Sequence, residues 1–581
     1  MDKGKQPDIE TIRHSLAHIL AFAVQDLWPG TKFGIGPAIE NGFYYDFGFP
    51  SPISENDLPK IEKKMRELLA KNIEFRIKNI EYEEAKKFFK NQPYKLELLD
   101  QVKQPTVYES GKFIDLCAGP HVKSTKEISA EGVKLTKTAG AYWRGSEKNP
   151  MLTRIYGVAF ATKKELEDYL IMQKEAEKND HRILGEKLGL FMFDEKIGKG
   201  LPLWLPKGYF IRHLLEEYMY NAEKEAGYLH ISTPILAKEE LYKTSGHLAH
   251  YKDEMYSPIE IENEKYYLRP MNCPHHHSVY KHALKSYKEL PLRLAEFGNV
   301  YRYEKSGVLT GLMRTRGFTQ NDAHIYATPE TLENEIIGIL DLFKKTYEDF
   351  KIEDYWFRLS LPDFKDKEKY GDIDNKDMWE KEIEALRRVL IKTKIKFAEA
   401  EGEASFYGPK IDIQIKDIRG KEDTIATVQV DYYSANKFDL AYIDEKGEKK
   451  PPVIIHRAIL GSFDRFFAFL LEKTAGNLPL WLSSIQVEII NIGESQSEYA
   501  KDILKQLKEA DIRAEIAKED MTLGKRIREA EMQKIPYILV VGDKEVKTKS
   551  VSVRQRGKGD LGQIKLEKFI KKVKIEIETK G

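Results

Sequence analysis

The pattern of apolar and polar positions divides the chain into three segments of different character. Near the N-terminus, "IRHSLAHILAFAV" predicts an apolar helix, and glycine- and proline-rich turns separate it from the apolar segment "FIDLCAGPHV". The stretch "KKELEDYLIMQKEAEKNDHRILGEKLG" then combines few helix breakers with many Glu/Lys pairs, which is typical of a solvated linker helix. We therefore expect a first domain that ends, with its linker helix, at residue 178.

The middle segment alternates long helical patterns with strands, beginning at "LPLWLPKGYFIRHLLEEYMYNAEKEAGY". In "KIDIQIKDI" three isoleucines fall on one face of a strand. In "TIATVQVDYY" the polar side chains of Thr427, Gln429 and Asp431 share the face opposite two valines. A sheet presents polar groups to a ligand in this way, so we expect a binding surface on this segment, residues 179–483.

The last segment, residues 484–581, changes to short apolar strands separated by helices. The strands are "QVEIINIG" and "YILVVGD", and the helical stretches are "SEYAKDILKQLKEA" and "LGKRIREAEMQ". This alternation predicts a small, separate α/β domain with some parallel strands. Lys and Arg outnumber Asp and Glu from Val541 to the C-terminus, which fits either a polyanion-binding patch or a solvated surface.

Length and composition set the outer limits. A chain of 581 residues accommodates three or four domains, and its formal net charge of +1 means that a polyanionic partner would be bound by local patches. Two distant cysteines do not predict a disulfide framework. The polar start and the lack of any long apolar run lead us to expect a soluble cytosolic protein.

The segment "RPMNCPHHHSVY" places one of these cysteines beside three histidines. Cys273 and His277 are four residues apart and would share a face of a helix, where they could bind a metal ion. Two ligands do not complete a catalytic zinc site, which needs three protein ligands and an open position. From this segment alone, a buried thiol beside a polar helix start is the favoured interpretation.

The most informative stretch is "EFGNVYRYEKSGVLTGLMRTRGFTQNDAHIY", residues 296–326, which predicts a strand, a loop and a return strand. Alternation would put Arg302 and Glu304 on one face, and it would put the polar side chains of the return strand on one face as well. Such a hairpin would form a polar surface on which a ligand could bind. Its charged and polar positions are Arg302, Glu304, Arg314, Arg316, Gln320, Asp322 and His324. An ordinary hairpin with surface ion pairs is the alternative.

Arginines in two places could bind the phosphates of a nucleotide. Arg302 and Arg314 offer guanidinium forks, and no phosphate-binding glycine loop of the GxxxxGK[ST] type occurs in the sequence. In "IIHRAILGSFDRFFAFLLE" an apolar strand leads through a Gly-Ser turn into a helix that Asp464 and Arg465 open. Because arginine in a first helical turn is unfavourable for the helix dipole, Arg465 also points to an anion.

These motifs together resemble a known family. Pro234 in "GYLHISTP", the block from "YRYE" to "MRTRGFTQNDAH", and "LGSFDRF" resemble motifs 1, 2 and 3 of class II aminoacyl-tRNA synthetases. With "MNCP" and "HRAILGS" the chain is similar to bacterial-type threonyl-tRNA synthetases over essentially its whole length. The resemblance implies an antiparallel-sheet catalytic core at 179–483, an N-terminal α+β editing domain at 1–178 and a C-terminal α/β anticodon-binding domain at 484–581.

The resemblance implies a ligand set for one zinc ion per subunit, with ligands that the sequence keeps far apart: Cys273, His324 and His456. His276 stands where the family often has histidine, and we expect it only behind the ligands. Three ligands leave a position at which zinc would bind the amino group and hydroxyl of threonine. Valine lacks that hydroxyl, whereas serine lacks only a methyl group, worth roughly 10- to 200-fold in discrimination. The expected enzyme therefore needs to edit seryl-tRNA.

The resemblance also assigns residues to ATP and to the amino acid. Arg302 would contact the α-phosphate, Glu304 the adenine, and Arg314 with Arg465 the γ-phosphate, while Mg²⁺ would screen the phosphates. His247 in "TSGH" would help to deprotonate the terminal ribose hydroxyl. The residues expected around the amino acid are Met271, Gln320, Asp322, Tyr407, Gln429 and Ser462.

The N-terminal segment supplies a second candidate site. His14 and His18 in "HSLAH" are one helical turn apart, and Cys117 and His121 in "CAGPH" could meet them. By spacing alone, a closed structural zinc site and a hydrolytic pocket are equally good interpretations. The resemblance favours a metal-free pocket that hydrolyses seryl-tRNA, with Tyr45, Lys95 and Asp115 at further matching positions.

The chain departs from the family at both ends. Family members commonly have a small ubiquitin-like domain before "HSLAH", and this sequence has only a short segment there. Many bacterial members have Asn and Lys where this chain has Asp520 and Thr522, although Glu545 and Arg554 match positions that read anticodon bases. The implied partners are tRNA(Thr), threonine and ATP, with a homodimer and a cytoplasmic location expected.

Two other functions remain to be separated from this one. A synthetase-like RNA-binding or regulatory paralogue would need neither the arginines nor the three candidate zinc ligands. A prolyl- or seryl-type class II ligase would lack the cysteine, histidine, histidine set. The sequence therefore favours a threonine-tRNA ligase over both.

Overall fold

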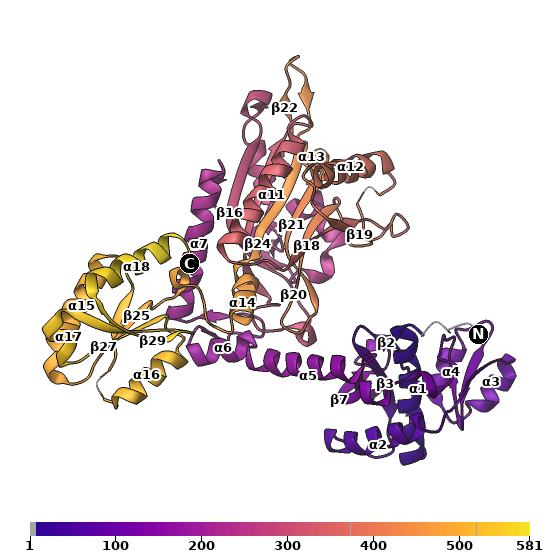
Figure 1. The fold of residues 1–581 in the computed structure, drawn as a ribbon. Coiled ribbons are helices and arrows are strands. Elements are labelled where there is room, and N and C mark those ends of the chain that lie inside the picture. Colours follow the sequence, from indigo (N-terminus) through magenta and orange to yellow (C-terminus); the bar gives the residue numbers. More distant parts are fainter. Residues whose placement is uncertain (1–6, 372, 519) are drawn as a thin grey trace. The chain divides into compact units, whose positions relative to one another are not determined.

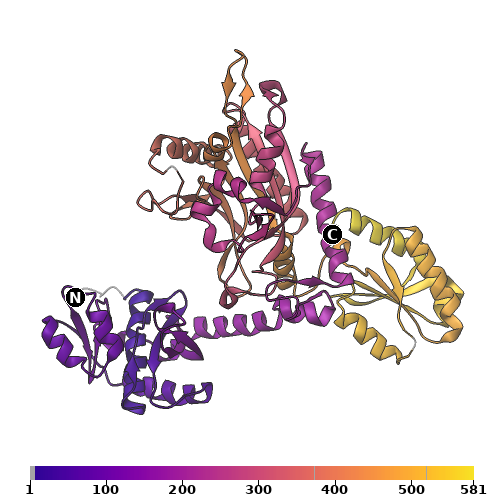
Figure 2. The ribbon, with the colours of Figure 1, turned by 180° about the vertical axis from the view of Figure 1, so that it is seen from behind.

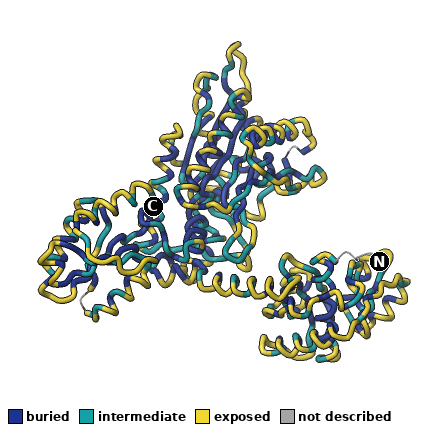
Figure 3. The backbone as a smooth tube through the Cα atoms, in the orientation of Figure 1, coloured by how far each residue is buried: buried dark blue, intermediate teal, exposed yellow. Residues whose placement is uncertain are grey.

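The computed structural model describes residues 7–371, 373–518 and 520–581, and the chain divides into two compact units, Met1–Lys174 and Glu175–Gly581. Helix α5, Lys163–Lys178, runs across this division, and most of its side chains are exposed, as the yellow tube in Figure 3 shows. The expected linker helix is thus present. It ends at Lys178, and a second helix, α6 (His181–Leu188), begins after Asp180, whose carboxylate accepts a hydrogen bond from the Arg182 amide.

The first unit packs a buried helix against two sheets. Helix α1, Ile9–Leu27, begins at Asp8, whose side chain accepts a hydrogen bond from the Thr11 amide. A five-stranded sheet contains β1 (Lys32–Phe33), β2 (Ala38–Ile39), β3 (Gly42–Gly48), β7 (Val133–Tyr142) and β8 (Met151–Ala159). A three-stranded sheet contains β4 (Phe75–Asn79), β5 (Thr106–Ser110) and β6 (Phe113–Leu116), and the helices include α2 (Leu58–Leu69), α3 (Tyr82–Phe88) and α4 (Pro93–Leu99). The unit has the predicted α+β character.

The second unit is built on an eight-stranded sheet of order β11-β16-β17-β24-β21-β20-β18-β19. Its inner pairs are antiparallel, and only the edge pairs β11·β16 and β18·β19 are parallel. In this order the strands are Leu229–His230, Leu292–Tyr301, Gly317–Ala327, Val453–Ser462, Glu422–Asp431, Lys410–Lys416, Tyr355–Leu361 and Phe397–Glu401. The predicted antiparallel-sheet core is confirmed (Figure 1).

Helices bury the apolar face of this sheet. The core side chains come from the strands and from α7 (Pro206–Glu225), α11 (Leu332–Asp349), α12 (Lys376–Lys392) and α14 (Phe463–Lys473). The alternation read from "KIDIQIKDI" is correct, because Ile411, Ile413 and Ile415 are all buried in this core. The other face of the central strands is left for polar side chains, and the candidate site lies there.

The C-terminal strands form a sheet of their own, in the order β26-β25-β27-β28-β29. Strands β25 (Val487–Asn491), β26 (Ala514–Ile516) and β27 (Tyr537–Val541) are parallel, whereas β28 (Ser550–Gln555) and β29 (Gly559–Lys565) are antiparallel additions. The helices are α15 (Ser497–Glu509), α16 (Leu523–Met532), α17 (Asp543–Thr548) and α18 (Leu566–Glu578), drawn in yellow tones in Figure 2. The predicted α/β character is confirmed.

Candidate functional site

A cleft of about 480 Å³ opens over the polar face of the eight-stranded sheet. Strands β17, β21 and β24 contribute its floor, and the segment from Met271 to Cys273 contributes a wall. The predicted site residues that line it are Met271, Cys273, Arg302, Gln320, Asp322, His324, Tyr407, Gln429 and His456. The structure thus brings into one cleft residues that span almost two hundred positions of the sequence.

Three candidate metal ligands converge in the cleft. Cys273, His324 and His456 are all buried, and each offers a ligand atom within 4.8 Å of the other two. Cys273 opens helix α10 (Cys273–Lys281), whereas the two histidines face each other on the paired strands β17 and β24. This pairing explains why the ligands need not be close in sequence: strand register places His324 directly opposite His456.

Hydrogen bonds behind His324 fix which ring nitrogen is free. The Glu296 carboxylate accepts from His276 Nε2 at 3.0 Å, so His276 Nδ1 is left to accept from His324 Nδ1 at 2.9 Å. His324 Nε2 then carries a lone pair, and it is buried with no hydrogen-bond partner in the described structure. An unpartnered buried nitrogen beside a thiol fits a metal ion, and the pattern matches the outer hydrogen bonds of known metal sites.

His456 is oriented in the same manner by Asp431. The Asp431 carboxylate accepts from His456 Nε2 at 2.8 Å, which leaves Nδ1 as the lone-pair nitrogen. Burial holds the pKa of His324 well below its ordinary value and raises that of the Cys273 thiol. A bound cation would reverse the penalty on the thiolate. The donor set of one sulfur and two neutral imidazoles fits zinc better than Mg²⁺ or Ca²⁺.

The neighbouring histidines do not complete this set. His276 lies behind His324, as expected, and His277 Nδ1 is 2.9 Å from the Tyr326 hydroxyl. His277, Asp431 and His456 also lie close enough to hold a metal ion. In that set, however, the Asp431 carboxylate already accepts from His456 Nε2, so a metal bound by both residues there would have to displace this hydrogen bond.

Of the candidate ATP-binding residues, only some line the cleft. Strand β16 ends at Tyr301, so the prediction that Arg302 and Glu304 alternate on a strand is wrong. Both follow in the loop, where Arg302 lines the cleft and donates to the Pro270 carbonyl. Glu304 accepts from Arg314 at 2.9 Å, outside the cleft lining. The Arg314 side chain is 54% exposed and therefore accessible to a ligand.

Arg465 and Ser462 lie at the start of α14. The Ser462 side chain caps the helix by accepting from the Arg465 amide at 3.1 Å, and the Arg465 guanidinium contacts Asp423. Neither residue lines the cleft. A guanidinium paired with a carboxylate can exchange that partner for a phosphate, because both present two acceptor oxygens to the same fork.

His247 lies beneath the wall of the cleft. Its Nδ1 is 2.8 Å from the Ser245 hydroxyl, and its ring packs edge-on against Phe406, a lining residue. The side chain is buried, and burial lowers the pKa of His247 to about 3. The imidazole is consequently a neutral base at physiological pH, with Nε2 lacking a partner among the described residues.

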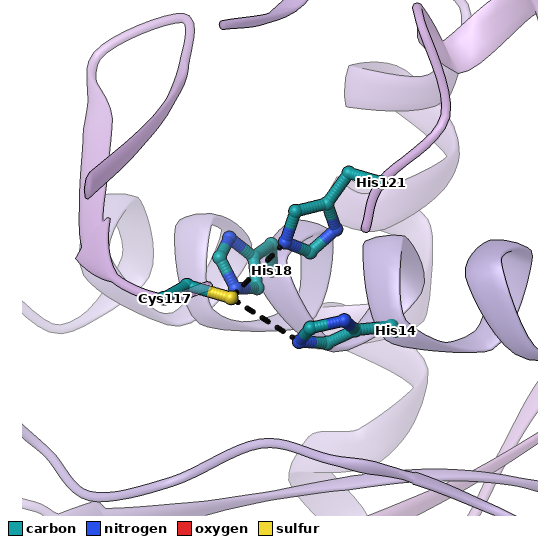
Figure 4. Close-up of side chains that lie close together, drawn as sticks. All are labelled: His14, His18, Cys117 and His121. Atoms are coloured by element: carbon teal, nitrogen blue, oxygen red, sulfur yellow. Dashed lines mark hydrogen bonds between the residues drawn. The ribbon is translucent and has the colours of Figure 1, made fainter. Parts of the chain in front are cut away.

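The N-terminal unit holds the second candidate site. Figure 4 shows His14, His18, Cys117 and His121 converging, with the Cys117 sulfur 3.4 Å from His14 Nε2 and 3.3 Å from His121 Nε2. The His14 Nδ1 donates to the Pro120 carbonyl, so its Nε2 is the acceptor nitrogen. Burial raises the pKa of Cys117 to about 11 and lowers the pKa values of His14, His18 and His121. These four groups are therefore neutral near pH 7.

A buried charged group adjoins these four side chains. Asp115 accepts from the Tyr45 hydroxyl at 2.6 Å and pairs with Lys95 at 2.5 Å, and His18 Nε2 is 3.6 Å from the same carboxylate. Lys95 and Asp115 are only 3% exposed. The structure thus brings together all seven residues predicted for editing: His14, His18, Tyr45, Lys95, Asp115, Cys117 and His121.

The two candidate anticodon residues differ in their surroundings. Glu545 is buried at the start of α17, where its carboxylate accepts from the Gly542 amide and the Ser552 hydroxyl. Arg554 on β28 is half-exposed and lies 3.6 Å from Glu531. Thr522 is the residue before α16 and makes no side-chain cap. Only Arg554 of the matching pair is thus free to reach a ligand directly.

Sequence reasoning missed the residues that orient the ligands. Glu296 and the tautomer-fixing role of Asp431 were not predicted, although Asp431 was placed on the polar face of β21 with Gln429. A signal existed for Asp431, because a carboxylate on the same strand face as a predicted ligand-binding glutamine points into the same cleft. Among the described residues, no helix is both long and apolar enough to cross a membrane.

Comparison with protein families gives three matches along the chain. Residues 255–474 match the tRNA synthetase class II core domain (G, H, P, S and T), and residues 486–576 match an anticodon binding domain. Residues 106–156 match the threonyl and alanyl tRNA synthetase second additional domain. The first match contains the three candidate metal ligands and the cleft lining from Met271 onward, and the third contains Cys117 and His121.

Curated relatives match almost the full chain. The threonine–tRNA ligase of Halalkalibacterium halodurans is 46% identical over 98% of this chain and 89% of its own length. Threonine–tRNA ligase 1 of Bacillus subtilis is 46% identical over 99% and 90%. Among solved structures, the RNA binding domain of threonyl-tRNA synthetase from Cryptosporidium parvum aligns with a TM-score of 0.64 and 36% identity, covering 68% of this chain and 98% of that one.

Proposed function

Because this chain belongs to the threonine–tRNA ligase family, we propose that it activates threonine with ATP and transfers it to tRNA(Thr). The observation that carries the proposal is the cleft in which Cys273, His324 and His456 meet beside Arg302. A class II core that only bound RNA would have no use for this arrangement. The core uses ATP with Mg²⁺, and we propose one zinc ion per subunit as the amino-acid-reading group.

The three ligands fit zinc by chemistry and by hydrogen bonding. A zinc ion held there would supply a Lewis-acidic centre with room for the amino and hydroxyl groups of threonine. Asp431 and the pair Glu296–His276 keep the imidazoles in the tautomers that bind a metal. Tyr407 stacks on His456 with ring centroids 4.7 Å apart and contacts Gln429 through its hydroxyl, which supports the proposal that both surround the amino acid.

Activation joins the threonine carboxylate to the α-phosphate of ATP and releases pyrophosphate. We propose that Arg302 stabilises the charge that develops on the α-phosphate, because it lines the same cleft as Gln320 and Asp322. Glu304 would contact adenine, while Arg314 and Arg465 would exchange their carboxylate partners for the γ-phosphate. Met271 lines the cleft and completes the proposed substrate contacts, whereas Ser462 lies outside the cleft lining and caps α14.

In the second step the threonyl group is transferred from the adenylate to the terminal ribose of tRNA, and AMP is released. His247 is a neutral imidazole close to the cleft wall, so it can accept the proton of the ribose hydroxyl either directly or through a bound group. Serine fits the same cleft with the loss of one methyl group, worth about 1–3 kcal/mol. This discrimination is too small for protein synthesis, so the proposed function includes hydrolytic editing.

We assign editing to the N-terminal pocket of His14, His18, Cys117 and His121. Neutral imidazoles and the Lys95–Asp115–Tyr45 group could orient a water molecule towards the ester of seryl-tRNA(Thr). The proposed domains are 1–178 for editing with the linker helix, 179–483 for catalysis and 484–581 for the anticodon. Arg554 would contact the anticodon directly, while Glu545 keeps its hydrogen bonds to Gly542 and Ser552 beside it. We also propose a cytoplasmic location for this enzyme.

We also propose a homodimer. Its support is exposed apolar side chains on α7 and on either side of Pro234: Tyr220 and Leu229 are 43% and 57% exposed, and Ile235 is 38% exposed. Exposed side chains of this size gather at interfaces between subunits.

The two cysteines provide a matched test of the zinc assignment. Cys273→Ser should lose zinc and threonine-dependent pyrophosphate exchange, because serine replaces a thiolate ligand with a poor one. Cys117→Ser makes the same chemical change in the other pocket and should retain both. Retention of zinc and normal exchange by Cys273→Ser would show that this group of residues is not the metal site.

A further inference from the structure

A buried histidine outside the cleft is hydrogen-bonded to both elements that carry candidate γ-phosphate arginines. His181 opens helix α6 and is 1% exposed. Its Nδ1 lies 2.6 Å from Glu472 Oε1 on α14, and its Nε2 lies 3.0 Å from the Leu312 amide nitrogen in the loop between β16 and β17. One imidazole therefore connects a helix and a loop that are separated by more than a hundred residues.

The partners fix the state of the ring. A carboxylate only accepts, so His181 Nδ1 carries the hydrogen, and Nε2 accepts from the Leu312 N–H. The backbone amide of His181 also donates to Glu472 Oε1, at 3.2 Å. Leu312 and Glu472 are both buried, so water cannot replace the imidazole for either group, and an unpaired buried donor is costly.

The loop is built to approach His181 closely. Gly311 has φ +48°, and a Cβ at this position would lie 2.1 Å from His181 Nε2. The turn is closed by hydrogen bonds between Thr310 and Arg314, and the Leu312 side chain is buried in the core. Any movement of this turn would break the bond to His181, and Arg314 is only two residues beyond Leu312.

His181 is also connected directly to the helix that carries Arg465. Helix α14, Phe463–Lys473, carries Arg465 in its first turn and Glu472 in its last. Asp180, which precedes His181, accepts from the guanidinium groups of Arg182 and Arg419, so the start of α6 is itself held in place. His181 is thus held in place and contacts both the loop that carries Arg314 and the helix that carries Arg465.

We propose that His181 is a positioning residue for the ATP-dependent step. By joining Leu312 to Glu472 it sets the distance between Arg314 and Arg465, the two side chains that would bind the γ-phosphate. The inference rests on the proposed function for the identity of the reaction. His181 does not touch ATP, so its removal should affect adenylate formation and leave transfer to tRNA intact.

Two amide variants separate the Leu312 bond from the rest of the side chain. In His181→Asn the amide occupies the position of Nδ1 and can still donate to Glu472, but nothing accepts from Leu312. In His181→Gln the longer side chain returns an acceptor to the position of Nε2. The backbone amide of residue 181 still donates to Glu472 in both variants, so the contact with α14 is retained in each, and a difference between them reports the bond to the loop.

The first assay is pyrophosphate exchange with threonine on the full-length protein. We expect His181→Asn to lower kcat/KM for ATP by about 10- to 100-fold, the effect of a small misplacement of reacting groups, with His181→Gln within about threefold of the original protein. Single-turnover transfer from preformed threonyl-adenylate to tRNA should be unchanged in both. Equal exchange in all three proteins, or an equal loss of exchange and transfer in the Asn variant, would overturn the proposal.

The second assay does not depend on which amino acid is activated. Amide hydrogen exchange of residues 309–316 should become faster in His181→Asn and remain slow in His181→Gln. Unchanged exchange in the Asn variant would contradict the role of His181, whatever the enzyme's substrate. A lack of threonine-dependent pyrophosphate exchange in the original protein would instead contradict the proposed function.

Discussion

Replacing Asp431 by asparagine tests the proposed zinc site without removing a ligand. One carboxylate oxygen of Asp431 accepts from the Ser434 amide at 2.7 Å, and the other accepts from His456 Nε2 at 2.8 Å. In Asp431→Asn the amide oxygen would remain with Ser434, so the NH₂ group would face His456 Nε2. Two donors would then meet, and the imidazole would have to move its hydrogen to Nδ1, the nitrogen left for the metal.

The size of the effect follows from burial. Asp431 and His456 are 0% and 4% exposed, so no water can take over the lost contact. Loss of an outer hydrogen bond of this type costs roughly 10- to 100-fold in metal affinity, or about 1.4–2.7 kcal/mol. The variant should consequently fold, bind zinc more weakly, and recover threonine activation when zinc is supplied in excess.

Competition with a chromophoric zinc chelator measures this affinity, and threonine-dependent pyrophosphate exchange at several zinc concentrations measures the recovery. Glu335→Gln is the matched control, since it changes a buried carboxylate, paired with Arg293 at 2.7 Å, to an amide outside the cleft. The reasoning would be refuted if Asp431→Asn held zinc as tightly as the control, because His456 would then bind no metal through Nδ1.

Two further predictions concern the N-terminal pocket. The variant His14→Ala/His18→Ala should charge tRNA with threonine normally and accumulate seryl-tRNA(Thr), measured by mass spectrometry of the charged tRNA. Its metal content should remain near one per chain. A closed structural zinc site would instead give about two metals per chain before mutation and lower thermal stability after it. Burial holds the pKa of His18 well below its ordinary 6.5. Below pH 6.5 the unfolded chain therefore binds a proton at His18 that the folded chain does not bind. The stability contributed by neutral His18 is present above pH 6.5 and is lost as the pH falls below it. Thermal unfolding should therefore show stability falling below pH 6.5 by up to about 1.4 kcal/mol per pH unit for this histidine, and His18→Gln should flatten the slope; identical slopes would contradict the assignment.

The parts of the fold that follow from local periodicity could be predicted from the sequence. Alternation of Ile411, Ile413 and Ile415 identified a strand with one apolar face, and the polar face of β21 indicated the position of the cleft. The class II core, the α+β N-terminal unit and the α/β C-terminal segment followed from these patterns and from the family motifs.

Features that depend on tertiary pairing could not be predicted. Arg302 lies beyond the end of β16 because the regular strand ends at Tyr301, a boundary set by pairing with β17 and not by the local sequence. Glu545 carries no local sign that its carboxylate would cap α17. His181 and Glu472 are 291 residues apart, and neither belongs to a motif, so only the folded chain reveals their contact.

The most direct test of the central claim is pyrophosphate exchange by the zinc-loaded protein with threonine, serine, valine and proline as separate substrates. Exchange should be fastest with threonine, roughly 10- to 200-fold weaker with serine because one methyl group is missing, and at least about 10⁴-fold weaker with valine because its hydroxyl is missing. Equal exchange with threonine and valine, or exchange with proline alone, would contradict a cleft that reads threonine through a metal-bound hydroxyl.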